Sequence, residues 1–201
     1  MNINFKNNND FIHFKKSVKD KLNNREIIKV DNPDLVPAAV MMLVFNRGGS
    51  PYVLLTKRTE KVKSHKGQVS FPGGVFDEED KEIIKTAFRE TWEEVGIPGE
   101  KIELLGQFDD YISPAGFKVS SFIGSFDYPF QYKVSRDEIE EIIEAPLSVF
   151  VNLDYERKED VVFMSKDYTM YYYDYMGFDI WGMTARVLTD FSQDIVLKQA
   201  D

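Results

Sequence analysis

The chain has 201 residues, 43% hydrophobic and 14% aromatic, which is typical of one globular domain with a sizeable core. Its net charge of -9 argues against nucleic acid as a partner. The absence of cysteine excludes disulfides, thiolate metal sites and cysteine nucleophiles. No apolar run approaches the ~20 residues that cross a bilayer, and the polar N-terminus lacks the apolar core of a signal peptide. We therefore expect a cytoplasmic protein that does not enter membranes.

The N-terminal segment predicts an amphipathic helix. Apolar residues recur at three- and four-residue steps over residues 10–24, and the Asn-rich run at 7–10 is a typical helix start. Asp31-Asn32-Pro33 then breaks the pattern. We therefore expect residues 1–33 to form a helical extension packed on a main domain of residues 34–201.

The main domain alternates strand-like and helical segments. Apolar runs at Ala38–Phe45 and Tyr52–Thr56 flank a Gly-rich turn and predict a buried β-hairpin. A helix is predicted over Asp80–Val95, because an apolar stripe runs to Gly96, a typical stop. This order of elements indicates an α/β or α+β sandwich. The other predicted elements are strands at Gln68–Phe71, Ile102–Leu105, Val119–Phe126 and Tyr168–Tyr175, a helix at Thr184–Phe191, and a helical or extended segment at Glu138–Ile143.

Three glutamates lie within about one turn of the predicted helix at 80–95. At ~100° per residue, Glu90 and Glu94 are ~40° apart beside the apolar stripe, and Glu93 projects away from it. Two carboxylates spaced in this way can bind Mg²⁺, which keeps its other positions for water and substrate phosphate. Taken alone, the glutamates fit better a solvated acidic face, with Arg89 and Glu93 as an ordinary i,i+4 ion pair.

The wider pattern favours the metal-binding interpretation. The stretch Gly74–Ile97 resembles the Nudix box, G-x(5)-E-x(7)-R-E-U-x-E-E-x-G-U, in which U is bulky and apolar. Its second half, RETWEEVGI, matches except that Thr91 fills a U position. In the first half, Asp80 stands in place of Glu, and eight rather than seven residues separate it from Arg89. This form resembles the coenzyme A pyrophosphatase branch of the Nudix hydrolases.

Two further stretches are similar to that branch. Leu54–Gly74, LLTKRTEKVKSHKGQVSFPGG, resembles the signature L-L-T-K-R-[SA]-x(3)-R-x(3)-G-x(3)-F-P-G-G, with Thr59 and Lys63 as departures. Ile180–Leu188, IWGMTARVL, is similar to the run I-W-G-x-T-A. The resemblance covers about Ala38–Phe191. It implies a Nudix-type α/β/α sandwich with a mixed central sheet and the hydrolysis of nucleoside diphosphate derivatives.

The resemblance also implies roles for individual residues. Glu90 and Glu94 become the main ligands of Mg²⁺ or Mn²⁺, and Glu93 a third ligand or a candidate general base. Arg89 is expected to orient a carboxylate rather than to touch substrate. Glu141 is a second candidate base, because family members often place a base in a late loop; for Glu141 alone, a solvated acidic turn is the simpler interpretation.

A basic stretch precedes the box. Residues 56–66 carry five Lys or Arg and His65 against one acid, and an anionic substrate such as coenzyme A needs local positive charge in so acidic a chain. For any single lysine, a position in a flexible solvated loop is as good an explanation as a role in substrate binding. Gly73 and Gly74 let the backbone approach a ligand, whereas we assign Trp181 to packing. The candidate substrate-binding residues are Lys57, Arg58, Lys63, His65, Gly73 and Gly74.

Three functional interpretations remain. The first is a Mg²⁺- or Mn²⁺-dependent pyrophosphatase of coenzyme A or its thioesters, which yields 3′,5′-ADP and (acyl-)4′-phosphopantetheine. The second is a Nudix hydrolase of ADP-ribose, NADH or a nucleotide sugar, kept open by Thr59, Lys63 and Asp80. The third is a Nudix-like binding module, but such modules usually lose the metal glutamates, and all three are present here. The partner is expected to be a small phosphorylated molecule, and a homodimer is possible.

Overall fold

A mixed β-sheet forms the centre of the computed structural model, which describes residues 3–61, 65–163 and 166–198. β1 (Val36–Arg47) and β2 (Ser50–Arg58) pair antiparallel, which confirms the predicted hairpin. β1 also pairs in parallel with β6 (Phe117–Ser125), so the sheet is mixed, as predicted. The other strands of this sheet are β3 (Val69–Ser70), β4 (Gly73–Val75), β5 (Glu103–Ile112) and β7 (Ile139–Pro146).

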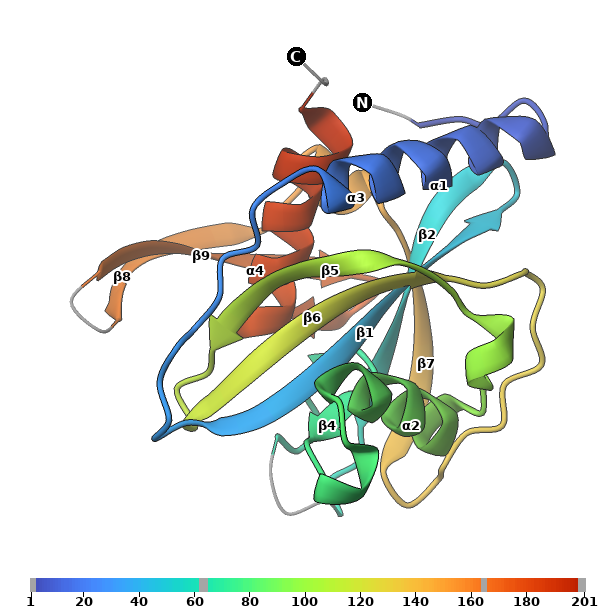
Figure 1. Ribbon diagram of the computed structural model, residues 1–201. Coiled ribbons are helices and arrows are strands. Elements are labelled where there is room, and N and C mark those ends of the chain that lie inside the picture. The colour runs from blue at the N-terminus through green and yellow to red at the C-terminus, as the bar shows by residue number, and fades with distance from the viewer. Residues whose placement is uncertain (1–2, 62–64, 164–165, 199–201) are drawn as a thin grey trace.

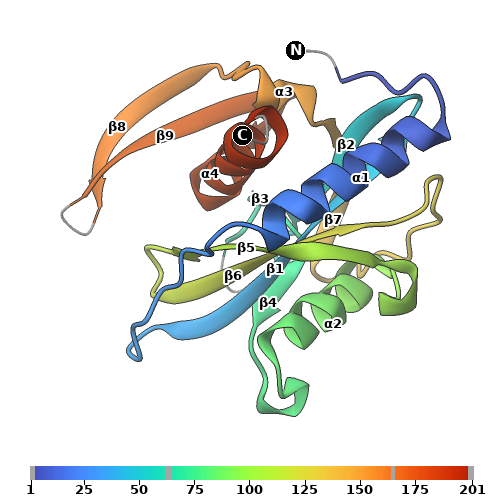
Figure 2. The ribbon, with the colours of Figure 1, turned by 45° about the horizontal axis from the view of Figure 1, so that its top comes forward.

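Both faces of the sheet are covered by helices (Figures 1 and 2). α2 (Ile83–Val95) lies on one face, whereas α1 (Asn8–Asn23) and α4 (Gly182–Phe191) lie on the other. The central part of β1, residues 38–45, is apolar because alternate residues pack into the two layers. Met41 packs in the cluster with α2, and Met42 packs in the cluster with α1 and α4. This α/β/α layering agrees with the predicted fold class.

The N-terminal helix packs against β5 through one apolar face. Asn7 caps α1 by accepting a hydrogen bond from the N–H of Asp10, and Val18 and Leu22 are buried against the sheet. None of the described helices is both long and apolar enough to span a membrane.

A second, three-stranded antiparallel sheet lies beside α4. It consists of β8 (Arg157–Phe163), β9 (Lys166–Tyr175) and β10 (Phe178–Ile180). β9 confirms the strand predicted around 168–175, and α4 confirms the predicted C-terminal helix. A short helix, α3 (Ser148–Val151), follows β7, and a π-helical segment, Ser192–Leu197, follows α4.

Two predictions about the segments around the glutamates need correction. The helix begins at Ile83 rather than Asp80, because a separate 3-10 turn, Glu78–Asp80, is capped by Asp77 and ends at Lys81 with a left-handed φ of 64°. The additional residue of the box therefore lies after this turn, between Asp80 and Arg89. The strand predicted at Gln68–Phe71 is also shorter, because β3 covers only Val69–Ser70 before β4 begins at Gly73 and pairs with β1.

Candidate active site

Glu94 is the most deeply buried charged side chain on α2. Its residue is 1% exposed, and its Oε1 accepts a hydrogen bond of 3.1 Å from Nη1 of Arg58 on β2. The second oxygen, Oε2, is buried without a hydrogen-bond partner among the described residues. Burial raises the pKa of the Glu94 carboxyl to about 8, against the opposing effect of Arg58. A buried carboxylate oxygen without a partner is costly, and a cation would satisfy it.

Glu90 lies one turn earlier on the same side of α2. Its Oε1 accepts a hydrogen bond of 2.7 Å from Arg89, and burial raises the pKa of its carboxyl. A Cβ on Gly74 would lie 2.4 Å from this Oε1, and a Cβ on Gly73 would lie 2.4 Å from the carbonyl oxygen of Ala39 on β1. The two glycines therefore make room for Glu90 and for β1, rather than for the ligand that we expected there.

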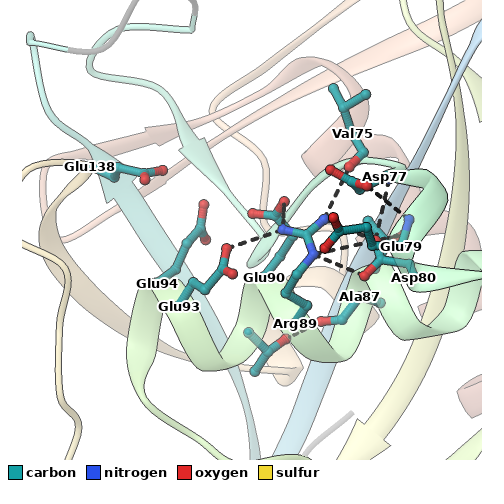
Figure 3. A network of polar contacts seen from close by, with 12 residues as sticks. Val75, Asp77, Glu79, Asp80, Ala87, Arg89, Glu90, Glu93, Glu94 and Glu138 are labelled. Carbon is teal, nitrogen blue, oxygen red and sulfur yellow. Dashed lines mark hydrogen bonds and ion pairs between the residues drawn. The ribbon is translucent and has the colours of Figure 1, made fainter.

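Arg89 is the centre of a hydrogen-bond network at the start of α2 (Figure 3). Its Nε lies 3.0 Å from Oδ1 of Asp80, and this contact holds the pKa of the Asp80 carboxyl below its ordinary value. Glu93 is half exposed and lies 3.1 Å from Nη1 of Arg89, so the expected i,i+4 pair is present. The guanidinium donates hydrogen bonds to Asp80, Glu90, Glu93 and the carbonyl oxygen of Val75.

Glu138 is an acidic residue of this site that the sequence analysis missed. It lies just before β7, with its Oε2 4.0 Å from Nη2 of Arg58. Figure 3 shows it on the side of Glu94 away from the Arg89 network. Burial is the main cause that raises the pKa values of Glu90 and Glu94, and the arginines oppose it. The negative charge of Glu138 is a smaller cause that also raises both pKa values. Glu138 therefore shares one electrostatic environment with both carboxylates of α2.

Glu141, the predicted second base, lies elsewhere. It belongs to β7, is exposed and pairs in register with Lys57. Side chains alternate along a strand, and Ile143, two residues later, packs in the cluster with α4, whereas Ile142 packs in the cluster with α2. Glu141 is therefore on the sheet face away from the carboxylates of α2, and the structure does not bring it to them.

The basic stretch is divided between the two faces of the sheet. Arg58 contacts Glu94 on the α2 side, whereas Lys57 follows Val53 and Leu55, which pack toward α4. Lys57 instead forms an ion pair of 3.0 Å with Glu140. Lys57 and Arg58 are adjacent in the sequence but do not share one site.

His65, the other described candidate of the basic stretch, does not contact the carboxylates. His65 is exposed, and its Nδ1 lies 2.8 Å from Oε1 of Gln68. Lys63 lies outside the described residues. Of the predicted substrate-binding residues, Arg58 contacts Glu94 and Gly74 lies against Glu90.

Residues 35–165 match the model of the NUDIX domain family. The chain belongs to the Nudix family. It is 37% identical over 158 residues to the Uncharacterized Nudix hydrolase NudL of Photorhabdus laumondii, a match that covers 79% of this chain and 84% of the relative. The protein of the same name from Enterobacter sp. is 33% identical over 160 residues, or 80% and 83% of the two chains.

The fold is similar to solved Nudix structures. The crystal structure of a NUDIX hydrolase from Nitrosomonas europaea aligns with a TM-score of 0.55 and 14% identity, over 84% of this chain and 76% of that one. Nudix hydrolases generally use divalent metals and act on small phosphorylated substrates.

The residues of this Nudix hydrolase fit a divalent cation. Within residues 3–61, 65–163 and 166–198, no three Asp, Glu or His side chains are already gathered around a common point. Arg58 and Arg89 hold the carboxylates of Glu94 and Glu90 instead. However, Glu94 has an unpartnered buried oxygen, and carboxylate oxygens are the ligands that Mg²⁺ and Mn²⁺ prefer.

Proposed function

We propose that this Nudix hydrolase cleaves the diphosphate bond of coenzyme A or acyl-CoA to 3′,5′-ADP and 4′-phosphopantetheine or its acylated form. The observation that carries the proposal is the contact between the coenzyme A-type signature and the carboxylate helix. Arg58, from Leu54–Gly74, binds Glu94, and Gly74, the last residue of that stretch, makes room for Glu90. The stretch that resembles the substrate-specific signature thus supports the two carboxylates best suited to bind metal.

Glu90 and Glu94 would hold Mg²⁺ or Mn²⁺, with Glu93 as a third or water-mediated ligand. When bound, the cation supplies polarisation of the diphosphate and activation of water. Arg89 would act as a positioning residue, since it is itself fixed by Asp80 and donates to Glu90 and Glu93. Oriented ligands of this kind commonly depend on such outer partners.

For the general base we propose Glu138 in place of Glu141. In hydrolysis, a water oxygen bonds to one phosphorus, the bridging P–O bond breaks, and the proton of the water must be accepted. A base must lie within reach of that water. Glu138 is near Arg58 on the α2 side of the sheet, whereas Glu141 is on the other face. Glu93 remains a second candidate, although its carboxylate already accepts a hydrogen bond from Arg89.

Product analysis tests the proposal. The protein is incubated with coenzyme A and Mg²⁺ or Mn²⁺, and the products are separated by chromatography. We expect 3′,5′-ADP and 4′-phosphopantetheine in equal amounts. The Glu94→Gln variant, purified in the same way, controls for contaminating hydrolases and is expected to be inactive. A parallel panel contains ADP-ribose, NADH and a nucleotide sugar, and turnover of one of these without turnover of coenzyme A would favour the alternative Nudix activity.

A further inference from the structure

A groove opens on the sheet face away from α2, where the start of β3 meets β10 and the N-terminus of α4. We call it the Trp181 groove. Its main side chains come from β2, from the turn before β3 and from residues 178–181, and they combine cations, an amide, a carboxylate and aromatic rings. They are Lys57, Lys66, Gln68, Phe178, Asp179 and Trp181.

A buried hydrogen bond fixes two walls of the groove relative to each other. The hydroxyl of Thr184, in the first turn of α4, donates to the carbonyl oxygen of Val69 on β3 at 3.0 Å. Both residues are buried. β10, which carries Phe178 and Asp179, pairs in turn with β9. The groove is therefore formed by paired strands and a helix end rather than by a loop alone.

Trp181 provides a supported aromatic surface in the groove. Its ring is stacked on Tyr172, with centroids 6.2 Å apart and an interplanar angle of 10°, and the Arg157 guanidinium lies over the Tyr172 ring. Despite this packing, Trp181 is 39% exposed. An indole that is held on a neighbouring ring and still open beside a groove suits a planar ligand, because nucleobases stack on such rings.

The polar groups of the groove suit the other parts of a nucleotide. Lys66 is exposed and makes no ion pair with the rest of the described chain, so its ammonium can bind a phosphate group. The ammonium of Lys57 already forms an ion pair of 3.0 Å with Glu140. Asp179 would repel a phosphate placed beside it, but its carboxylate can accept hydrogen bonds from ribose hydroxyls or a base amino group. The groove therefore favours a whole phosphorylated nucleoside over a free phosphate ion.

The groove is also next to the candidate active site along β2. Lys57 faces the groove and its neighbour Arg58 contacts Glu94, so one residue step separates the two faces. β2 ends at Arg58 and β3, which pairs with it, begins at Val69, so a long substrate can pass from one face to the other around this end of the two strands. We propose that the Trp181 groove binds the phosphorylated nucleoside end of the substrate while its diphosphate lies at Glu90 and Glu94; this rests on the proposed function.

Tryptophan fluorescence tests the proposal without catalysis. The chain has 2 tryptophans, and Trp92 is exposed on α2, so a Trp92→Phe variant leaves Trp181 as the only reporter. This variant is titrated with 3′,5′-ADP in the presence of EDTA. We expect a saturable change in fluorescence and about tenfold weaker binding on adding Lys66→Ala, the loss typical of one charged hydrogen bond. Lys101→Ala, an exposed lysine beyond α2, is the matched control.

Three results would overturn the proposal: no fluorescence response to 3′,5′-ADP, equal binding of unphosphorylated adenosine, or an equal loss in the Lys101→Ala variant. Steady-state kinetics separate this proposal from the proposed function. If coenzyme A is hydrolysed and Lys66→Ala leaves KM unchanged, the groove assignment fails while the function stands. If coenzyme A is not hydrolysed but the titration gives the expected pattern, the function fails while the nucleotide site stands.

Discussion

Arg58 on β2 donates a hydrogen bond of 3.1 Å to Glu94 on α2, and this pair joins the basic stretch to the carboxylate helix. The guanidinium neutralises part of the buried charge, but burial dominates and the pKa of Glu94 stays raised, at about 8. Oε2 of Glu94 and Nε of Arg58 are both buried without hydrogen-bond partners in the described chain. The pair is therefore incompletely satisfied, which is expected of groups that serve a ligand.

Metal affinity should depend on pH because Glu94 must lose its proton before it can act as a ligand. With a pKa of about 8, its carboxyl is mostly protonated at pH 6.5 in the metal-free protein. We expect Mn²⁺ affinity to rise by up to about tenfold per pH unit toward pH 8 and then to level off. Calorimetry in buffers of different ionisation enthalpy would show up to one proton released per ion below pH 8. Equal affinities at pH 6.5 and 8.5 would contradict the assignment.

The same group should make the metal-free protein less stable as pH rises. The folded-state pKa of Glu94 lies above the ordinary value of 4.5, so its neutral form favours folding. This contribution is complete below about pH 4.5 and is lost as pH rises toward about 8. We expect the free energy of unfolding of the wild type to fall between pH 5 and 8 relative to Glu94→Gln, measured with urea in EDTA. Glu93→Gln changes an exposed position and retains Glu94, so its free energy of unfolding should fall with pH in parallel with that of the wild type.

The sequence predicted the carboxylate helix well because its geometry is local. A period of 3.6 residues fixes Glu90, Glu93 and Glu94 relative to the apolar stripe, and the strong stop at Gly96 marks the end of the helix. The helix start was harder to predict. It depends on the capped turn at Glu78–Asp80 and on the left-handed Lys81, which no periodicity reveals.

The residues brought from other elements were harder to predict because they depend on strand pairing. Side chains alternate between the two faces of a strand, so Lys57 and Arg58 are placed on opposite faces only once both are known to lie in β2. The acidic segment at 138–143 fits a helix or a strand by sequence, and the two give different faces for its glutamates. Pairing of β7 with β2 decides the matter and leaves Glu138 on the side of Glu94.

Glu138 and Glu141 form a matched pair of variants for the general base. We expect Glu138→Gln to lower kcat by about 10²- to 10⁴-fold, the range for loss of general base catalysis, with little change in KM. Glu141→Gln should stay within about twofold of wild type, because it is on the other face of the sheet. Steady-state kinetics of the two variants would measure kcat and KM separately. The opposite ranking of the two variants would restore Glu141 as the base.

Gly74 should be required for the position of Glu90 rather than for backbone flexibility. A Cβ at this position lies 2.4 Å from Oε1 of Glu90, so Gly74→Ala must displace that carboxylate. Displacement of a catalytic group by about 1 Å can lower activity by about 100-fold, and we expect a loss of this size with a weaker Mn²⁺ affinity. Gly99→Ala is the control, because its Cβ would make an ordinary contact of 3.4 Å with Phe88.

A second substitution distinguishes this clash from a general disturbance of β4. Asp is one methylene shorter than Glu, so Glu90→Asp withdraws the carboxylate from the position that the new methyl group needs. If the clash is the cause, Glu90→Asp should cost less Mn²⁺ affinity in the Gly74→Ala background than in wild type, which a double-mutant cycle measures as a coupling energy. Additive losses would show that Gly74→Ala acts through the pairing of β4 with β1 instead. Unfolding curves of all four proteins would then separate the two causes. If Gly74→Ala breaks strand pairing, it lowers the free energy of unfolding whether or not Glu90→Asp is also present.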